Sequence, residues 1–246
     1  MTDGAPAVVF DRVSKSFGAK QVLRDVSFDV RAGEALCVLG RSGTGKSVTL
    51  KLIISLLKPD EGNIWIEQDE ITRLKESELS RVRRKMGFLF QDAALFDSLT
   101  LYENLALPLL RLTSKSPQEV DFVIERVLRQ VGLAGDKRKM PSELSGGMRK
   151  RAGLARALVL EPRILLADEP SSGLDRITAS EIDDLLLRQK VEHNTALIVV
   201  THDVHGARRV GDRIAVLDQG RLVACGKPAE IEHSENEVAR NLVTEY

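Results

Sequence analysis

One octapeptide constrains the fold of this chain more than any other segment. It fits the pattern G-x-x-x-x-G-K-[ST] and consists of Gly40, Arg41, Ser42, Gly43, Thr44, Gly45, Lys46 and Ser47. The apolar run 35–39 precedes it, and residues 46–57 follow with the character of a helix. A glycine-rich turn between a strand and a helix directs backbone N–H groups at an anion near the helix N-terminus. We therefore expect an α/β core with a phosphate loop at residues 40–47.

Within the phosphate loop, two side chains have chemistry of their own. The Lys46 ammonium would neutralise the β and γ oxygens of a nucleoside triphosphate, and the Ser47 hydroxyl would hold Mg²⁺. The alternative is an ordinary flexible turn of glycine and serine, which the strand–loop–helix setting disfavours.

The hydrophobic pattern predicts the elements around this loop. Apolar runs with the length of strands occur at 7–13, 26–30, 35–39, 86–90, 164–167, 196–200 and 214–217. Residues 92–160 are expected to be largely helical, with one apolar face made of Val120, Ile124, Val127, Leu128 and Val131. Continuous apolar strands alternating with helices indicate a parallel sheet covered on both faces. We expect one domain with two lobes and no linker.

Composition excludes several classes of protein. Hydrophobic residues make up 43% of the 246, which is enough for a large core, and the 36 basic residues equal the 36 acidic ones. A formal net charge of zero gives no global field that would attract nucleic acid or anionic lipid. Cys37 and Cys225 are too few for a disulfide framework or a metal knuckle. We found no signal peptide and no apolar stretch long enough for a membrane span, and expect a soluble, cytosolic chain.

Two acids stand at the end of the apolar run 164–167. Ligands of α/β proteins bind at strand ends, so Asp168 suits the Mg²⁺ shell and Glu169 suits the polarisation of a water for in-line attack on the γ-phosphate. Taken alone, such a pair is more often the solvated start of a loop. The phosphate loop in the same chain favours the functional interpretation.

Three single residues complete the candidate site. His202 ends another strand, where its imidazole would reach the γ-phosphate region, and Gln91 ends the strand at 86–90, where its amide would touch metal or water. Phe17 would stack on adenine. Their ordinary alternatives are a structural histidine, a loop amide and a core aromatic.

A second glycine turn follows about a hundred residues after the phosphate loop. Residues 144–148 include Ser145, Gly146 and Gly147. One triphosphate has one γ-phosphate, which the phosphate loop already wraps, so a second anion-binding turn needs a second nucleotide. The turn therefore indicates that ATP is used together with another copy of the chain.

Taken in order, these motifs resemble the nucleotide-binding subunit of ABC transporters. The set comprises Phe17, the phosphate loop, Gln91, residues 144–148, the pair Asp168 and Glu169, residues 172–175 and His202. The resemblance covers essentially the whole chain. It implies an ABC-type P-loop NTPase domain spanning 1–246, with a RecA-like core, an antiparallel β subdomain and a helical subdomain at about 92–160.

The resemblance also implies partners and a location. Ser145, Gly146 and Gly147 of one protomer would close on the ATP held by Lys46 of the other, in a head-to-tail homodimer that encloses two ATP molecules with Mg²⁺. Residues 172–175 would cross the interface. Integral-membrane permease subunits would hold the dimer peripherally at the cytoplasmic face of the inner (plasma) membrane, and nucleic acid is not an expected partner.

One residue departs from the family pattern Leu-Ser-Gly-Gly-Gln, because Met148 takes the fifth place. Together with residues 90–100 and 102–104, it is similar to the ATPase of Mla/MCE-type systems, which move phospholipid or other lipid between membranes with a permease and an MCE-domain protein. The alternative within transport is the ATPase of an amino-acid or lipoprotein-type transporter.

Two classes outside transport fit the sequence less well. Soluble ABC proteins that act on ribosomes or DNA usually have two cassettes in one chain or a long coiled-coil insert, and neither is seen here. A degenerate, purely regulatory cassette would be expected to lack Lys46, Glu169 or His202, all of which are present.

Three further features have more than one interpretation. Six apolar residues would either grip a membrane subunit or pack the helical lobe: Leu95, Phe96, Leu99, Leu101, Leu105 and Leu107. The basic clusters at 81–85, 137–139 and 149–151 are interpreted as solvated faces, with contact to lipid headgroups or a partner's acids as the alternative. The amphipathic tail 237–246 would cap the domain or reach a neighbour, and the sequence does not choose between them.

Overall fold

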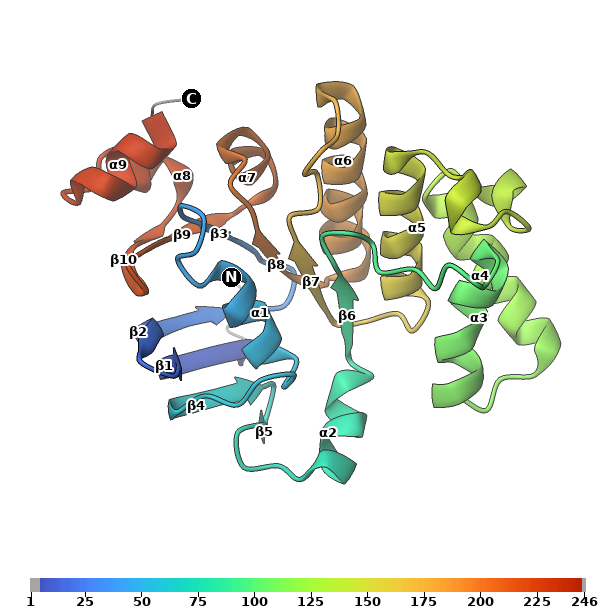
Figure 1. Cartoon of the computed structure of the whole chain (residues 1–246), viewed down its shortest axis with the longest axis horizontal. Coiled ribbons are helices and arrows are strands. Elements are labelled where there is room, and N and C mark those ends of the chain that lie inside the picture. Colours follow the sequence, from blue (N-terminus) through green and yellow to red (C-terminus); the bar gives the residue numbers. More distant parts are fainter. Residues whose placement is uncertain (1–4, 245–246) are drawn as a thin grey trace.

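Two β-sheets form the frame of the protein, which is described by a computed structural model over residues 5–244. The larger sheet has the order β10-β9-β3-β8-β7-β6. It is parallel except for the antiparallel pair of β9 and β10 at one edge. Its strands are β3 (Ala35–Leu39), β6 (Met86–Leu89), β7 (Ile164–Asp168), β8 (Ala196–Val200), β9 (Arg213–Asp218) and β10 (Arg221–Gly226). Figure 1 shows them side by side across the centre of the molecule. The expected parallel sheet is confirmed.

The smaller sheet is antiparallel and has the order β2-β1-β4-β5. Its strands are β1 (Val8–Phe17), β2 (Lys20–Val30), β4 (Glu61–Ile66) and β5 (Asp69–Glu70). Leu50 and Ile53 of α1 (Lys46–Ile53) share one core with this sheet and with Leu36 and Val38 of β3. Helix α1 therefore lies between the two sheets, and the N-terminus of that helix carries the phosphate loop.

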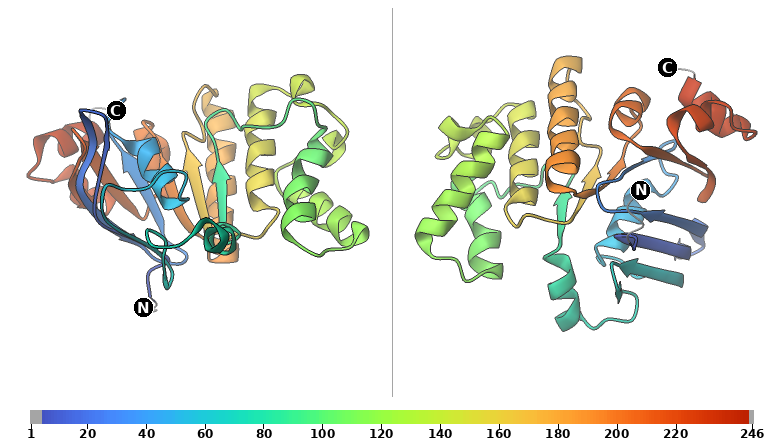
Figure 2. Two further views of the ribbon diagram at one scale, coloured as in Figure 1. Left: turned by 60° about the horizontal axis from the view of Figure 1, so that its bottom comes forward. Right: turned by 180° about the vertical axis from the view of Figure 1, so that it is seen from behind.

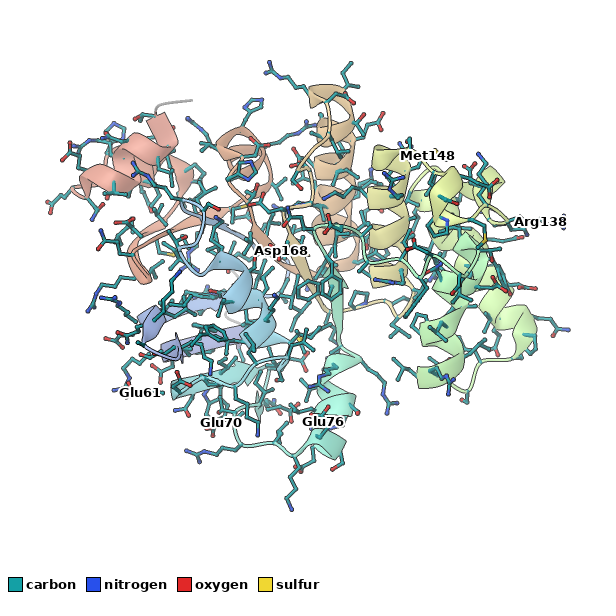
Figure 3. The ribbon with its side chains drawn as sticks, in the orientation of Figure 1. Glu61, Glu70, Glu76, Arg138, Met148 and Asp168 are labelled. Carbon is teal, nitrogen blue, oxygen red and sulfur yellow. The ribbon has the colours of Figure 1, made fainter. Side chains whose placement is uncertain are left out.

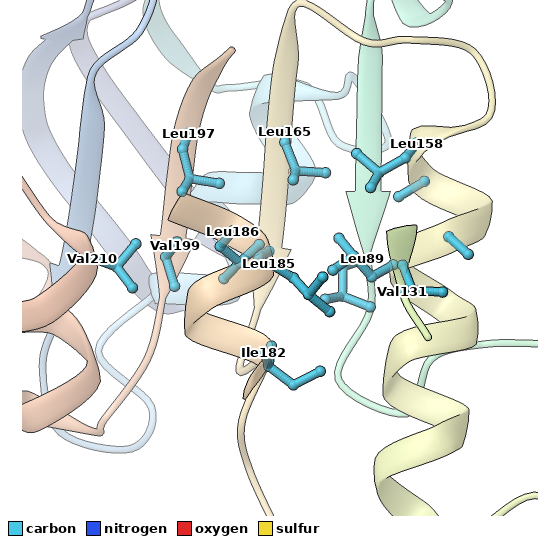
Figure 4. Packing of buried hydrophobic residues seen from close by; sticks show 14 of the residues in the cluster. Leu89, Val131, Leu158, Leu165, Ile182, Leu185, Leu186, Leu197, Val199 and Val210 are labelled. Atoms are coloured by element: carbon cyan, nitrogen blue, oxygen red, sulfur yellow. The ribbon is translucent and has the colours of Figure 1, made fainter. Parts of the chain in front are cut away.

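The opposite face of the larger sheet packs against α5 (Gly146–Leu158), α6 (Arg176–His193) and α7 (Val204–Val210). Residues alternate between the two faces along each strand, so Leu165 and Leu197 point toward α6 while Leu166 and Ile198 belong to the other core. Figure 4 shows this packing around Leu186 of α6. Burial on both faces explains why these strands are continuous apolar runs.

Helices α3 (Leu101–Leu112) and α4 (Pro117–Gln130) lie beyond β6, at the opposite side of the larger sheet from the antiparallel sheet (Figure 2). Two 3₁₀ turns, Ala134–Asp136 and Pro141–Glu143, connect α4 to α5. The apolar face predicted at helical spacing is confirmed, because all its members are buried: Val120, Ile124, Val127, Leu128 and Val131.

Several boundaries differ from the sequence prediction. The helix expected over 46–57 ends at Ile53, and Ser55 has a φ of 58°, in the left-handed region that a helix cannot continue through. The prediction also lacked β4, β5, β10 and helix α2 (Glu76–Arg83). Helix α2 and β5 are mostly polar and β4 begins with Glu, Gly and Asn, so their hydrophobic pattern is weak, whereas β10 contains the apolar run 222–225, which the prediction did not use.

The C-terminal tail caps the domain. It forms α8 (Pro228–Glu232) and α9 (Glu237–Thr244), and Ala239 and Val243 of α9 are fully buried in the core. The last two residues of the predicted segment, 245–246, lie outside the described part. Across residues 5–244, no helix has both the length and the apolar character that a membrane crossing requires.

Candidate functional site

The predicted site residues gather where the parallel strands end. The phosphate loop connects β3 to α1, and Gln91 follows β6. Asp168 ends β7 and Glu169 follows it, and His202 lies after β8. A cavity of about 530 Å³ lies beside them. Its lining includes Phe17, Lys20, Val22, Ser42, Gly43, Gly45, Lys46, Ser47, Val48, Gln91, Glu169 and His202. Phe17 is 47% exposed, so its ring is accessible to a ligand, and the Lys15 ammonium lies 5.6 Å from the ring centroid.

The backbone of the phosphate loop requires its glycines. Gly43 and Gly45 have φ values of 82° and 103°, in the left-handed region that side chains rarely adopt. The Thr44 hydroxyl donates to the Arg41 carbonyl (2.9 Å) and closes the turn, while a Cβ on Gly40 would lie 2.4 Å from the Leu217 carbonyl oxygen. The loop therefore has the compact curl that an anion-binding turn needs.

Lys46 reaches back over the loop that precedes it. Its ammonium donates to the carbonyls of Gly40 (2.7 Å) and Arg41 (3.1 Å). The pKa of Lys46 is lowered, because burial outweighs the opposing effect of the Glu169 and Asp168 carboxylates. A buried cation with two carbonyl partners at the rim of a cavity suits exchange of those partners for phosphate oxygens.

Ser47 and Asp168 form an oxygen pair suited to a divalent cation. The Ser47 hydroxyl donates to Asp168 Oδ1 at 2.8 Å, and the carboxyl is only 7% exposed. Burial first, and then the neighbouring Glu169, raise the pKa of Asp168, although the hydroxyl opposes this. Hydroxyl and carboxylate oxygens are the ligands that Mg²⁺ prefers, and a cation here would offset the cost of burying the charge.

Glu169 and His202 are in direct contact. Glu169 Oε2 lies 2.8 Å from His202 Nδ1 and also accepts from the Thr201 hydroxyl (3.3 Å). The His202 ring is largely exposed, whereas the Glu169 carboxyl is mostly covered. These contacts fix the carboxylate at the end of β7, with the imidazole between it and solvent. The pair can orient a water next to the phosphate loop.

The second glycine turn lies apart from the phosphate loop of the same chain. Ser145 caps α5 by accepting from the Met148 N–H (3.2 Å), and both Ser145 and Gly146 are exposed. Gly146 lines another cleft, of about 420 Å³, which shares Gln91 with the first cavity. A Cβ on Gly147 would lie 2.5 Å from Thr178 Cγ2. Figure 3 shows Asp168 and Met148 on separate elements, β7 and α5.

One residue of the basic cluster 149–151 contradicts the prediction of a solvated face. Lys150 is buried, and its ammonium donates to the Glu169 carbonyl (2.9 Å) and the Ser172 hydroxyl (3.2 Å). Sequence reasoning missed it, although a signal existed: Lys150, Leu154 and Leu158 recur every four residues on the buried face of α5.

The remaining basic residues mostly pair with acids of the same chain. Examples are Arg81 with Asp69 (2.6 Å), Lys137 with Glu125 (2.9 Å) and Arg151 with Glu181 (2.8 Å).

The apolar residues at 95–107 divide between core and surface. Leu101 and Leu105 are fully buried, Leu95 packs on the core, and Phe96 is half exposed. The surface available to a partner is therefore smaller than the sequence pattern indicates.

Comparison with known proteins identifies the family. Residues 23–172 match the family model described as ABC transporter. The chain is 43% identical over 237 residues to the probable ribonucleotide transport ATP-binding protein mkl of Mycobacterium leprae (strain TN), covering 96% of this chain and 68% of that protein. It is 39% identical over 249 residues to the chloroplastic protein TRIGALACTOSYLDIACYLGLYCEROL 3 of Arabidopsis thaliana, covering 94% and 72% respectively.

A third relative is the methionine import ATP-binding protein MetN 1 of Paraburkholderia xenovorans (strain LB400), with 39% identity over 92% of this chain and 66% of that protein. Among solved structures, the dimeric post-hydrolysis state of the ATP-binding cassette MJ0796 bound to ADP and Pi superposes with a TM-score of 0.83 at 35% identity. That match covers 89% of this chain and 98% of the other. The chain therefore belongs to the ABC transporter family, as an ATP-binding subunit that hydrolyses ATP for a transporter.

Proposed function

We propose that this ATPase drives the transport of phospholipid or another lipid between membranes, as a homodimer held at the cytoplasmic face of the inner membrane by permease subunits. The observation that carries the ATPase chemistry is the paired geometry at the strand ends, Ser47 with Asp168 and Glu169 with His202, beside the phosphate loop. The lipid cargo is supported by Met148 and by a relative whose name contains a galactolipid.

ATP would occupy the cavity of about 530 Å³. Adenine would stack on the accessible ring of Phe17, and the phosphates would take the N–H groups of residues 40–47. Lys46 would leave its two loop carbonyls for the β and γ oxygens. Ser47, Asp168 and Gln91 would hold Mg²⁺, which when bound neutralises charge on the phosphate oxygens.

Hydrolysis would depend on the orientation of a water by Glu169. The contacts of its carboxylate with His202 and Thr201 hold it at the end of β7. His202 would approach the γ-phosphate, and Lys46 would stabilise the charge that develops there. ATP binding would close two protomers on each other, and hydrolysis would reopen them.

The substitution Glu169→Gln tests the site. Removing the carboxylate charge while keeping its shape is expected to leave ATP binding and ATP-dependent dimerisation intact, and to lower kcat by at least about 100-fold. Single-turnover hydrolysis and size-exclusion chromatography with ATP measure these properties. Glu192→Gln, an exposed change on α6, is the matched control and should retain normal turnover. Normal hydrolysis by Glu169→Gln would show that the assigned role is wrong.

The cargo is tested by identifying the membrane partners. Affinity purification of the tagged subunit from membranes is expected to recover a permease together with an MCE-domain protein. Recovery of a permease with a solute-binding protein would instead support the second candidate, an amino-acid-type transporter, which the methionine-import relatives favour. That result would overturn the lipid proposal without affecting the ATPase site.

A further inference from the structure

The backbone of Glu169 has an unusual conformation. Its φ is 48°, in the left-handed region that residues other than glycine seldom occupy. A left-handed residue at a site persists only where surrounding contacts hold it. The Glu169 N–H donates to the Val200 carbonyl at 2.8 Å, which fixes one side of this residue to β8. The other side is its carbonyl.

Three donors converge on that carbonyl. The Lys150 ammonium donates at 2.9 Å, the Ser172 hydroxyl at 3.0 Å and the Ser172 N–H at 3.2 Å. Lys150 also donates to the Ser172 hydroxyl at 3.2 Å. The buried Lys150 ammonium therefore connects Glu169 to Ser172 in the loop that follows Pro170. Hydrogen bonds from a charged donor are stronger than those from neutral groups.

The position of Lys150 connects this turn to α5. Lys150 lies one helical turn after Gly146, and both line the cleft of about 420 Å³ with Ser172. The pKa of Lys150 is lowered, because burial outweighs the opposing effect of the carboxylates of Asp92, Glu169 and Asp168. Asp92 directly follows Gln91, so the ammonium also sits in the field of the segment after β6. A buried lysine surrounded this way is placed for its charge and its donors rather than for packing alone.

We infer that Lys150 is a positioning residue for ATP hydrolysis: it holds the strained Glu169 backbone, and thereby the direction of the Glu169 carboxylate, from the first turns of α5. The inference rests on the proposed role of Glu169. Because α5 starts at the exposed second glycine turn, a contact that moves the helix would be transmitted through Lys150 to the Glu169 carbonyl. Binding of ATP to the phosphate loop of the same chain does not need this link, since Lys150 does not line the cavity with Phe17 and Lys46.

Two substitutions in the full-length protein test the inference. Lys150→Met keeps the length of the side chain and removes its donors, whereas Lys150→Gln keeps a donor without the charge. Lys150→Met is expected to lower kcat by about 10- to 100-fold, the range caused by a slightly misplaced catalytic group. The KM for ATP and the affinity for a fluorescent ATP analogue should stay within about twofold of the wild type, since misplacement affects only the transition state. Lys150→Gln should recover part of the lost kcat.

Arg151→Met is the matched control, because Arg151 lies next to Lys150 on α5 and pairs with Glu181 of α6 instead of the Glu169 carbonyl. Its kcat should remain near that of the wild type, and thermal melting shows whether each variant is folded at the assay temperature. Wild-type kcat in folded Lys150→Met would overturn the inference. So would an equal loss of kcat in Arg151→Met, or no recovery in Lys150→Gln. If Glu169→Gln hydrolyses ATP normally, the proposed role of Glu169 fails first; if Glu169→Gln is slow and Lys150→Met is normal, only the present inference fails.

Discussion

Asp183 is a buried carboxyl whose surroundings oppose its charge. It lies on α6, is 7% exposed and lines a cleft of about 850 Å³ that also includes Arg176 and His205. Burial first, and then the Asp203 carboxylate, raise the pKa of Asp183 from 3.8 to about 6, while Arg209 acts in the opposite direction. The folded state therefore holds this proton more tightly than the unfolded chain.

This shift predicts a pH-dependent stability. The contribution of Asp183 to the free energy of unfolding is fully present below its unfolded-state pKa of 3.8. It is lost as the pH rises through the folded-state pKa of about 6. Above that pH, the buried ionised carboxyl lowers the free energy of unfolding by about 3 kcal/mol, which follows from the rise of its pKa from 3.8 to about 6. We expect Asp183→Asn to raise the free energy of unfolding by roughly 1–3 kcal/mol at pH 8, and by roughly half as much at pH 5. Urea denaturation at both pH values measures the difference.

The matched control is Asp184→Asn, because Asp184 is half exposed and pairs with Arg209 at 2.5 Å. The Asp184 charge makes the smallest of the contributions to the raised pKa of Asp183, so its removal, together with the loss of the exposed ion pair, should change the free energy of unfolding by less than about 1 kcal/mol at either pH. An Asp183→Asn protein that is equally stabilised at pH 5 and pH 8, or not stabilised at all, would contradict the explanation by linkage.

At the scale of elements, the start of α3 is held by one buried amide. Asn104 is fully buried; its Nδ2 donates to the carbonyls of Phe96 (3.1 Å), Leu99 (3.0 Å) and Thr100 (3.0 Å), and its Oδ1 accepts from the Phe96 N–H (2.8 Å). The side chain thus satisfies the backbone of the loop 96–100. This gives a physical reason for an asparagine in the segment 102–104, which the sequence indicated only by resemblance.

Asn104→Ala is expected to lower the free energy of unfolding by roughly 2–4 kcal/mol, because it leaves several buried polar groups without partners. The backbone amides of 96–100 should also exchange faster with deuterium, since the loop loses its anchor. Urea denaturation and hydrogen exchange measure the two effects. Glu103→Gln, an exposed neighbour that keeps an acceptor for Thr100, should cost less than about 1 kcal/mol. Equal stability of the two variants would contradict the role of Asn104.

Elements were predictable where one physical pattern dominates. The run 35–39 matches β3 at both ends, because it is apolar throughout and is followed by Gly40. Strands β4 and β5 were missed because one is half polar and the other has two residues, so neither gives an alternating signal. Within the site the reason is different: Asp168 and Glu169 are predictable from a strand end, whereas the helical spacing of Lys150, Leu154 and Leu158 is masked by the basic residues on either side of Lys150.

At the scale of the whole molecule, the residues proposed to bind nucleotide lie on two separate surfaces. Phe17, Lys46 and Ser47 line one cavity, and Gly146 lines another. Both Ser145 and Gly146 are exposed at the N-terminus of α5, where the helix dipole favours an anion. A single chain therefore does not bring its second glycine turn onto its own phosphate loop. Dimeric cassettes are seen among the similar solved structures, and a head-to-tail dimer would join the two surfaces.

The substitution Ser145→Arg tests this division. A long cation at the exposed start of α5 would fill the space that a partner's nucleotide needs, while the cavity with Lys46 is unchanged. We expect the monomer to bind a fluorescent ATP analogue with near-normal affinity, and the ATP-dependent dimer to be lost together with steady-state hydrolysis. Analytical ultracentrifugation, in the background Glu169→Gln to prevent turnover, measures the dimer.

The control for Ser145→Arg is Ser142→Arg, an equally exposed serine in the turn before α5. It adds the same charge and bulk three residues earlier, away from the helix N-terminus, and should leave the ATP-dependent dimer intact. If both variants dimerise, Ser145 does not face a partner's nucleotide and the head-to-tail arrangement is wrong. If neither variant dimerises, added positive charge near α5 is itself sufficient to separate the protomers, and Ser145→Ala then decides. Loss of the dimer in Ser145→Ala would support direct contact between Ser145 and the partner's nucleotide. A normal dimer in Ser145→Ala would exclude that contact.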